Sequence, residues 1–138
     1  MNRADLQTLA DLRVGDAKVL LDGGRFAAAY YLLGYAVECA LKASVAKQIR
    51  QRDFPDKQLI LDSYTHDLEK LLRISGLRSE FDKRVATDKP FEVSWTTIKD
   101  WNENSRYDAT TTEVKARDLF GAVTDPKAGV LEWLKTLW

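Results

Sequence analysis

The amino-acid sequence predicts an all-α fold, arranged as an up-and-down bundle of four to five helices. Three observations lead to this prediction. Apolar residues recur at spacings of three and four along most of the chain, no segment alternates apolar and polar residues over more than a few positions, and the twelve residues from Phe26 to Val37 carry no charge. A helix that is apolar on all sides belongs at the centre of a bundle, so we expect the other helices to surround this one.

The composition is that of one folded domain spanning residues 1–138. Hydrophobic residues make up 45% of the chain and charged residues 30%, whereas disordered chains are less apolar and less balanced in charge. Lysine and arginine number 21, and so do aspartate and glutamate. No overall field attracts nucleic acid or an anionic membrane, and contact with a polyanion must therefore be local.

The sequence also predicts a cytoplasmic protein without membrane association. The one cysteine, Cys39, cannot form an intramolecular disulfide, which fits a reducing compartment, and its apolar surroundings predict a buried structural thiol. The first residues have no apolar signal core, and the twelve-residue uncharged stretch is too short to span a bilayer.

Two long helices are predicted in the first third of the chain. The first runs over about five turns, with Asn2 as its cap and Gly23-Gly24 as its stop signal. The second covers about Arg25 to Arg52, and Pro55 ends it. Because only a glycine turn joins them, we expect the two helices to pack antiparallel.

Shorter helices are predicted in the middle. One begins near Ser63 or Thr65 and ends at Gly76, and another covers residues 78–85. Ser94 has the chemistry of a cap for a further short helix, which carries Trp95, Ile98 and Trp101.

The last helix is predicted to be long and kinked. Thr110 and Glu113 have the spacing of a capping box, and apolar residues continue at helical spacing to Trp138. Asp125-Pro126 within this helix indicates either a kink or a new N-cap with proline at the first helical position. We favour the kinked continuous helix.

Few residues offer catalytic chemistry. The chain has a single histidine and a single cysteine, and no glycine-rich phosphate loop. A structural zinc site needs about four nitrogen or sulfur ligands, and no helix has the Glu-x-x-His pattern of di-metal bundles. We therefore expect no metal and no cofactor, and the residues alone identify no catalytic group.

Five residues are candidates for a binding site. Glu38 is the first ionisable group after the uncharged stretch, and Lys42 follows one turn later in the favourable order for an ion pair. His66 is predicted in the first turn of a helix, where the dipole favours the neutral imidazole; the alternative is a histidine that merely packs against a neighbouring helix. Arg106 and Tyr107 lie in a polar loop, where the guanidinium can bind a phosphate, pair with Glu38 or cap backbone carbonyls.

Two further patterns have a functional and a structural interpretation. Five cations near the end of the second helix can bind nucleic acid, although a solvated helix end is the commoner meaning of such a cluster. The cations are Lys42, Lys47, Arg50, Arg52 and Lys57. The four tryptophans can stack on bases, but their helical spacing favours core or interface packing.

These residues occur in an order that resembles a known family. The pattern comprises Ala17, Leu20, Leu21, Gly24, Arg25 and Phe26, then Tyr31, Leu32, Gly34, Glu38, Leu41, Lys42 and Ala43, and finally Thr65-His66-Asp67-Leu68 and Arg106-Tyr107. It resembles the HEPN superfamily, the higher eukaryotes and prokaryotes nucleotide-binding domain, over nearly the whole chain. The resemblance implies a bundle of four or five helices, a homodimer with a cleft at its interface, and roles in RNA cleavage, toxin–antitoxin pairs, nucleotide binding or partnership with a nucleotidyltransferase.

The ribonuclease signature of this family is absent. Ribonuclease members carry an arginine followed, after four to six residues, by a histidine. Leu59, Ile60 and Leu61 occupy the positions where the arginine would precede His66, and the corresponding window after Arg106 holds no histidine. Without that pair, family-type RNA cleavage loses its general acid or base, and the interpretation leans away from an enzyme.

The sequence therefore predicts a non-catalytic, HEPN-like binding module that is homodimeric. Its ligand would be a nucleotide, an RNA or a nucleotidyltransferase-type partner, held in a cleft formed by Glu38, Lys42, His66, Arg106 and Tyr107, with Glu38 orienting Arg106 or His66. The alternatives are a divergent ribonuclease toxin that uses His66 and Arg106, and a purely structural protein-interaction bundle.

Overall fold

A computed structural model describes residues 1–50 and 56–138 of the chain. Every regular element in these ranges is a helix, which confirms the all-α class. The elements are α1 (Arg3–Asp22), α2 (Phe26–Arg50), α3 (Lys57–Asp62), α4 (Leu68–Ile74), α5 (Arg78–Thr87), α6 (Lys89–Ile98), the 3-10 helix η1 (Glu103–Tyr107), α7 (Glu113–Thr124) and α8 (Val130–Lys135). None of the described helices is both long and apolar enough to cross a bilayer.

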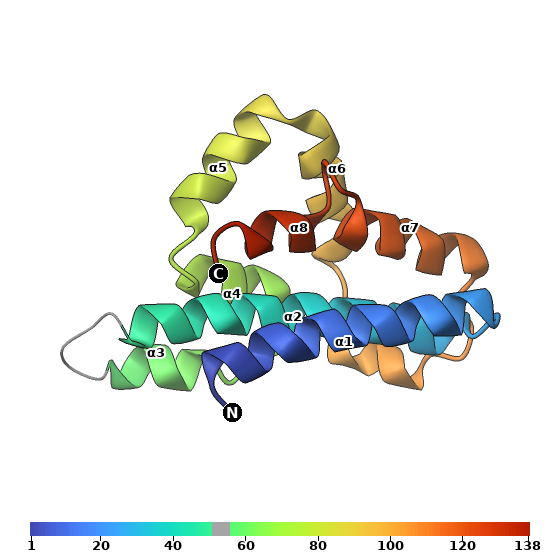
Figure 1. Cartoon of the computed structure of the whole chain (residues 1–138), viewed down its shortest axis with the longest axis horizontal. Coiled ribbons are helices and arrows are strands. Elements are labelled where there is room, and N and C mark those ends of the chain that lie inside the picture. Colours follow the sequence, from blue (N-terminus) through green and yellow to red (C-terminus); the bar gives the residue numbers. More distant parts are fainter. Residues whose placement is uncertain (51–55) are drawn as a thin grey trace.

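The two long helices α1 and α2 pack antiparallel, as predicted (Figure 1). Asn2 caps α1 in a capping box with Asp5, since each side chain accepts a hydrogen bond from the other residue's backbone N–H. At the other end Gly24 adopts a φ of 75°, a left-handed conformation that glycine takes without strain. These local signals set the length of α1 and the sharp return into α2.

Helix α2 lies at the centre of the molecule. It contacts α1, α4, η1, α7 and α8, and buries residues on all sides from Ala29 to Val45. The uncharged stretch is therefore the central helix of the fold, as its composition predicts.

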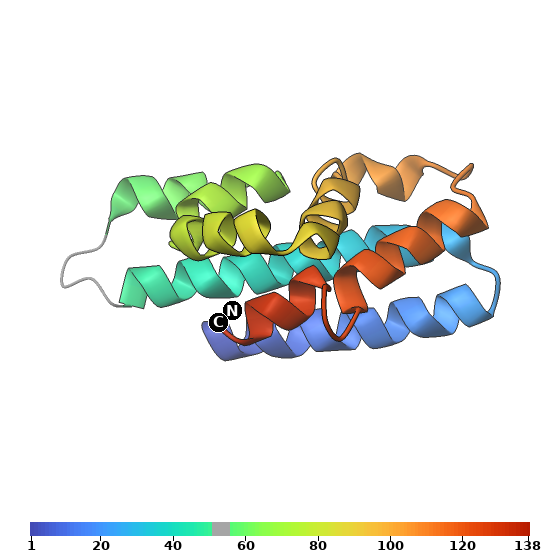
Figure 2. The same cartoon turned by 90° about the horizontal axis from the view of Figure 1, so that it is seen from above.

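A second layer of helices covers one side of the α1–α2 pair, seen above it in Figure 1 and from its outer side in Figure 2. Aromatic rings from α5, α6 and α8 meet edge to face in this layer, with centroids 5.2–6.0 Å apart. The rings are Phe81, Phe91, Trp95 and Trp133. Trp95, Trp101 and Trp133 are buried, which confirms core packing for three of the four tryptophans.

The prediction of one kinked C-terminal helix is wrong. Helix α7 ends at Thr124 and α8 begins at Val130, with a turn between them. The Asp125 carboxylate accepts hydrogen bonds from the backbone N–H groups of Lys127 and Ala128, both at 2.8 Å. This side chain satisfies donors that a continuous helix would have satisfied within its backbone, and so stabilises the break.

Other helix boundaries also differ from the prediction. Residues 1–50 and 56–138 contain eight α-helices, α3 among them, in place of the expected four to five, so that bundle is not confirmed. Asp88, six residues before the predicted cap Ser94, caps α6, and Ser94 is buried within that helix. Thr112 rather than Thr110 caps α7. The predicted break at Pro55 and the cation Arg52 lie outside the described residues.

Candidate functional site

Glu38 is the centre of a polar cluster on α2. Its side chain is 2% exposed, and its Oε1 atom lies 2.9 Å from both Lys42 Nζ and His66 Nδ1. The other oxygen, Oε2, is buried and has no hydrogen-bond partner among the described residues. Lys42 and His66 thus both contact the same carboxylate oxygen, and the positive charge of Lys42 balances the buried negative charge.

His66 reaches Glu38 from the loop in front of α4. Asp67 caps α4, so His66 lies just outside the helix and not in its first turn as predicted. A carboxylate only accepts hydrogen bonds, so the contact requires the proton on Nδ1 and leaves Nε2 directed away from Glu38. The His66 side chain is 51% exposed, so a ligand can reach this free nitrogen.

The surroundings of Glu38 disfavour further negative charge. Burial, and then the Glu38 carboxylate, raise the pKa of the Cys39 thiol to about 11. Burial likewise raises the pKa of the Tyr35 hydroxyl. Cys39 is therefore a protonated, buried thiol at neutral pH, in agreement with the structural role expected for it.

Arg106 and Tyr107 form a second cluster, together with Tyr31 of α2. The guanidinium carbon of Arg106 lies 5.0 Å from the centre of the Tyr107 ring. Hydrogen bonding to Tyr107, and then to Tyr31, raises the pKa of Arg106. Both η1 residues are exposed, and no carboxylate pairs with Arg106 among the residues that the structure describes. The neighbours of this cation are therefore neutral tyrosines, which leave its charge unbalanced.

Tyr31 links Arg106 to the core. Its ring stacks on Tyr35 at a centroid distance of 6.2 Å and on Trp101 at 6.0 Å. Trp101 in turn lies flat against Gly34 of α2, where an added Cβ would come within 2.1 Å of the indole. Glycine at this position therefore allows Trp101 to support the tyrosine that holds Arg106.

The two clusters share one face of α2. Tyr31, Tyr35, Glu38 and Lys42 follow one another at spacings of four, three and four, which places them in one row on a helix. Tyr31 precedes Glu38 by seven residues, or roughly 10 Å along the axis. The structure thus brings Glu38, Lys42 and His66 into direct contact, and it holds Arg106 and Tyr107 about two turns away on the same face.

A small cavity opens beside His66. It has a volume of about 310 Å³ and lies between the start of α4 and the segment that leads into η1. Four carboxylates and one lysine line it, namely Asp67, Glu69, Asp100, Glu103 and Lys99. Because negative charge dominates this cavity, a phosphate group is favoured at Arg106 and disfavoured here.

Sequence reasoning predicted that Glu38 would orient either Arg106 or His66, and the structure shows contact with His66. It did not identify Tyr31, Tyr35 or Trp101 as part of the site. The tyrosines have the right spacing from Glu38, but the uncharged stretch was interpreted only as core. Their partial exposure arises because η1 covers just part of this face of α2.

Some of the described cations at the basic end of α2 are engaged in contacts within the chain. Lys42 pairs with Glu38, and Lys47 donates a hydrogen bond to the Leu137 carbonyl at 3.0 Å. Two of the five cations therefore serve contacts within the chain, which favours the solvated helix end over a nucleic-acid surface at this place.

Metal-ligand geometry and comparison with known proteins do not extend the assignment of function. Among the described residues, no group of three or more histidine, cysteine, aspartate or glutamate side chains could hold a metal ion. Comparison of the chain with family models, with curated proteins and with solved structures gave no match. The assignment of function thus depends on the geometry of the α2 face, and the HEPN resemblance stays a prediction.

Proposed function

We propose that the chain is a non-catalytic binding module for a ligand that carries both a phosphate and an aromatic base, either a nucleotide or single-stranded RNA. The observation that carries the proposal is Arg106. Its guanidinium is exposed, lies over the Tyr107 ring with Tyr31 nearby, and has no carboxylate partner among the described residues. Arginine in this state binds phosphate through charge-assisted hydrogen bonds.

Aromatic groups next to Arg106 supply the second half of the binding site. The Tyr107 side chain is 75% exposed, so a base can stack beside the phosphate that Arg106 holds. In this arrangement the Glu38 cluster is an organiser: it holds His66, whose half-exposed ring can contact a polar group of the ligand. Because Tyr31 and Glu38 are seven positions apart on one face of α2, the two clusters together suit a nucleotide with its base, or two successive nucleotides, better than a single phosphate.

One observation favours the alternative of a divergent ribonuclease. A carboxylate that binds Nδ1 of a histidine leaves Nε2 as a proton acceptor, which is the arrangement of many general bases. The α2 residues that these groups contact, Tyr31 for Arg106 and Glu38 for His66, are seven positions apart, and no direct contact joins Arg106 to His66 among the described residues. Expression of the wild type beside His66→Ala separates the two functions, because only a toxin stops growth in a manner that depends on His66.

Titration with nucleotides and with a fluorescent six-nucleotide RNA tests the binding proposal. We expect Arg106→Ala to raise Kd about 10- to 100-fold, since a charge-assisted hydrogen bond contributes about 1.5–3 kcal/mol. The matched control is Arg73→Ala, which removes an exposed arginine on α4. Absence of binding by the wild type, or equal effects of the two substitutions, would overturn the proposal.

The resemblance also predicts a homodimer and a nucleotidyltransferase-type partner, and both are proposals. A pull-down of such a protein by the wild type but not by Arg106→Ala would place the partner on the same face of α2. Retention by both proteins would place it elsewhere.

A further inference from the structure

A polar cavity of about 250 Å³ lies where the segment between η1 and α7 passes the start of α2 (Figure 1). Residues from α2, from η1 and the segment before it, and from α7 line this cavity. Neither Arg106 nor a member of the Glu38 cluster is among the described residues that do so. What binds in the cavity is therefore a separate question from what binds at Arg106.

Tyr30 of α2 brings a hydroxyl without a partner to this cavity. The residue is only 8% exposed, and no hydrogen bond to its hydroxyl occurs among the described residues. The oxygen is not itself fully buried, so it opens into the cavity that Tyr30 lines. Burial, and then the carboxylates of Asp100 and Asp108, raise the pKa of Tyr30. The hydroxyl therefore keeps its proton at neutral pH and is available as a hydrogen-bond donor.

Two opposite charges lie near Tyr30 and do not pair with each other. Lys115 of α7 places its Nζ atom 4.9 Å from the centre of the Tyr30 ring, and the Asp100 carboxylate acts on the hydroxyl. Both residues line the cavity, yet neither has an ion-pair partner in the part of the chain that the structure describes. Asp108 lines it too, but its carboxylate already accepts two hydrogen bonds from Thr110, at 2.8 and 2.6 Å. The free charges of the cavity are thus one ammonium and one carboxylate.

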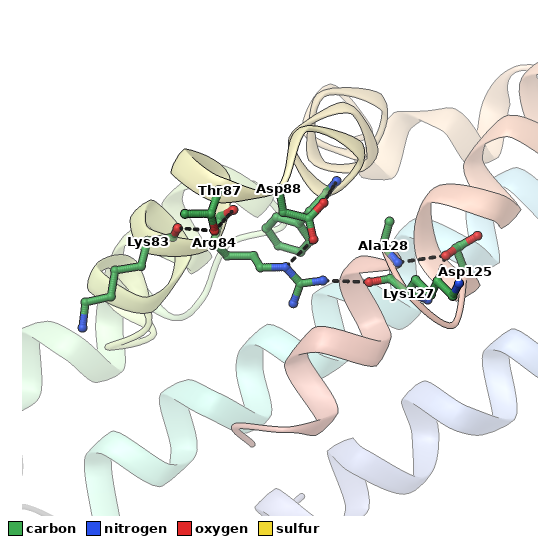
Figure 3. Close-up of polar contacts among 8 residues, drawn as sticks. Lys83, Arg84, Thr87, Asp88, Asp125, Lys127 and Ala128 are labelled. Carbon is green, nitrogen blue, oxygen red and sulfur yellow. Dashed lines mark hydrogen bonds and ion pairs between the residues drawn. The ribbon is translucent and has the colours of Figure 1, made fainter.

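Charges of opposite sign pair closely elsewhere on the surface. Arg84 Nε donates to Asp88 Oδ2 at 2.7 Å, and a terminal nitrogen of Arg84 donates to the Lys127 carbonyl at 2.7 Å (Figure 3). That guanidinium is engaged twice within the chain and has fewer donors left for an outside molecule. Lys115 and Asp100 make no such contact among the described residues, so both keep their hydrogen-bonding capacity for a ligand.

Neutral groups of η1 and of the segment before it complete the lining. Asn102 Oδ1 accepts a hydrogen bond from the Asn104 backbone N–H at 2.9 Å, and the Asn104 side chain itself is exposed beside the cavity. Ser105 Oγ is buried and has no partner in the described ranges. Amides and hydroxyls both donate and accept hydrogen bonds, so this part of the cavity suits a ligand with a polar side group.

We propose that this cavity binds a small zwitterion, namely a free α-amino acid with a short polar side chain. The carboxylate of the ligand lies at Lys115 and accepts the hydrogen bond of the Tyr30 hydroxyl, and its ammonium group lies at Asp100. The side chain of the ligand meets the amide of Asn104. One positive and one negative charge on the protein thus find one of each on the ligand, whereas a phosphate would be repelled by Asp100 and Asp108.

The size of the cavity agrees with a ligand of this class. A volume of 250 Å³ is about eight times the share of one water molecule in the liquid, which is about 30 Å³. It therefore holds a molecule of about eight non-hydrogen atoms, which is the size of serine, threonine or asparagine. A whole nucleotide is too large for it.

Isothermal titration of the full chain with free L-serine, L-threonine, L-asparagine and L-aspartate tests the proposal. We expect at least one of the four to bind with a Kd below about 1 mM. Its N-acetyl derivative and its amide each lack one of the two charges, and both are expected to bind at least tenfold more weakly. These derivatives test the charge complementarity on the unaltered protein, so the result does not depend on any variant folding.

Substitutions then locate the site. Asp100→Asn and Lys115→Gln each remove one exposed charge and are expected to raise the Kd at least tenfold, and Tyr30→Phe about three- to tenfold. The matched controls are Asp118→Asn and Lys83→Gln, which neutralise exposed charges outside the cavity and are expected to leave the Kd within twofold. Circular dichroism and thermal unfolding show that each variant is folded.

Two outcomes would overturn the proposal. One is the absence of binding by all four amino acids at about 10 mM, and the other is equal binding of an amino acid and its singly charged derivatives. Two further titrations keep this proposal separate from the nucleotide or RNA site. Arg106→Ala is expected to leave the amino-acid Kd unchanged, and Lys115→Gln is expected to change the Kd for RNA less than threefold, since Lys115 does not contact Arg106 among the described residues.

Discussion

The two clusters on one face of α2 differ in whether their charge is buried and paired or exposed and unpaired. Around Glu38 the charge is buried and is balanced by Lys42, with His66 as a second partner. Around Arg106 the charge is exposed and is contacted by neutral tyrosines. A balanced, buried charge organises the protein itself, whereas an unbalanced and exposed charge is available to a ligand. This comparison predicts that changes near Glu38 affect stability and that changes near Arg106 affect binding.

The largest effect on stability is expected at Gly34, which lies between the two clusters. Gly34→Ala brings a Cβ within 2.1 Å of the Trp101 indole, so the ring must move and Tyr31 loses its support. We expect a loss of about 2–3 kcal/mol in the free energy of unfolding, measured by urea denaturation. Gly15→Ala is the control, since that Cβ meets no atom within 4 Å and alanine favours a helix by up to about 1 kcal/mol. Equal stability of the two variants would show that Trp101 does not pack closely against Gly34 of α2.

The buried thiol gives a second prediction, which concerns pH. Because the pKa of Cys39 is raised to about 11 from 9.0, the native state keeps a proton that the unfolded chain releases between these values. The contribution is complete below pH 9 and is lost as the pH rises through 11, by about 3 kcal/mol in total. Urea denaturation at pH 8 and pH 10.5 measures it, with Cys39→Ala as the reference that lacks the titrating group. If both proteins lose the same stability over this range, the thiol ionises in the folded state.

A smaller loss of stability is expected for Glu38→Gln. The amide keeps the shape of the side chain and one acceptor, but it removes the charge that Lys42 balances. We expect the free energy of unfolding to fall by about 1 kcal/mol, because Lys42 and His66 are exposed enough to be solvated. The Kd for RNA or nucleotide is expected to change less than threefold. A tenfold change in Kd with unchanged stability would reverse the roles assigned to the two clusters.

Sequence reasoning succeeded where local chemistry decides the structure. The Asn2 cap, the glycine turn after α1 and the central position of α2 all follow from signals within a few residues. It failed where two local signals compete. Thr110 and Thr112 can both cap α7, and Asp125 can either continue a kinked helix or close a turn through its own carboxylate.

The binding site was predictable only in part, for a related reason. The sequence shows that a buried Glu38 carboxylate needs partners, and it left Arg106 and His66 as candidates; the structure shows the contact with His66. The attachment of Arg106 to Tyr31 depends on how η1 crosses α2, and that crossing is set by the fit of Trp101 against Gly34. No pattern along the chain encodes a contact between residues 31 and 106, since it arises from tertiary packing.

The most direct test compares the two cations of the α2 face in a single binding assay. Arg106→Ala and Lys42→Ala each remove one positive charge, and the Kd of a short single-stranded RNA is measured for both at the same salt concentration. The account predicts an increase of about 10- to 100-fold for Arg106→Ala and of less than threefold for Lys42→Ala, because only the Arg106 charge is free to meet a phosphate. A larger effect of Lys42→Ala than of Arg106→Ala would contradict it.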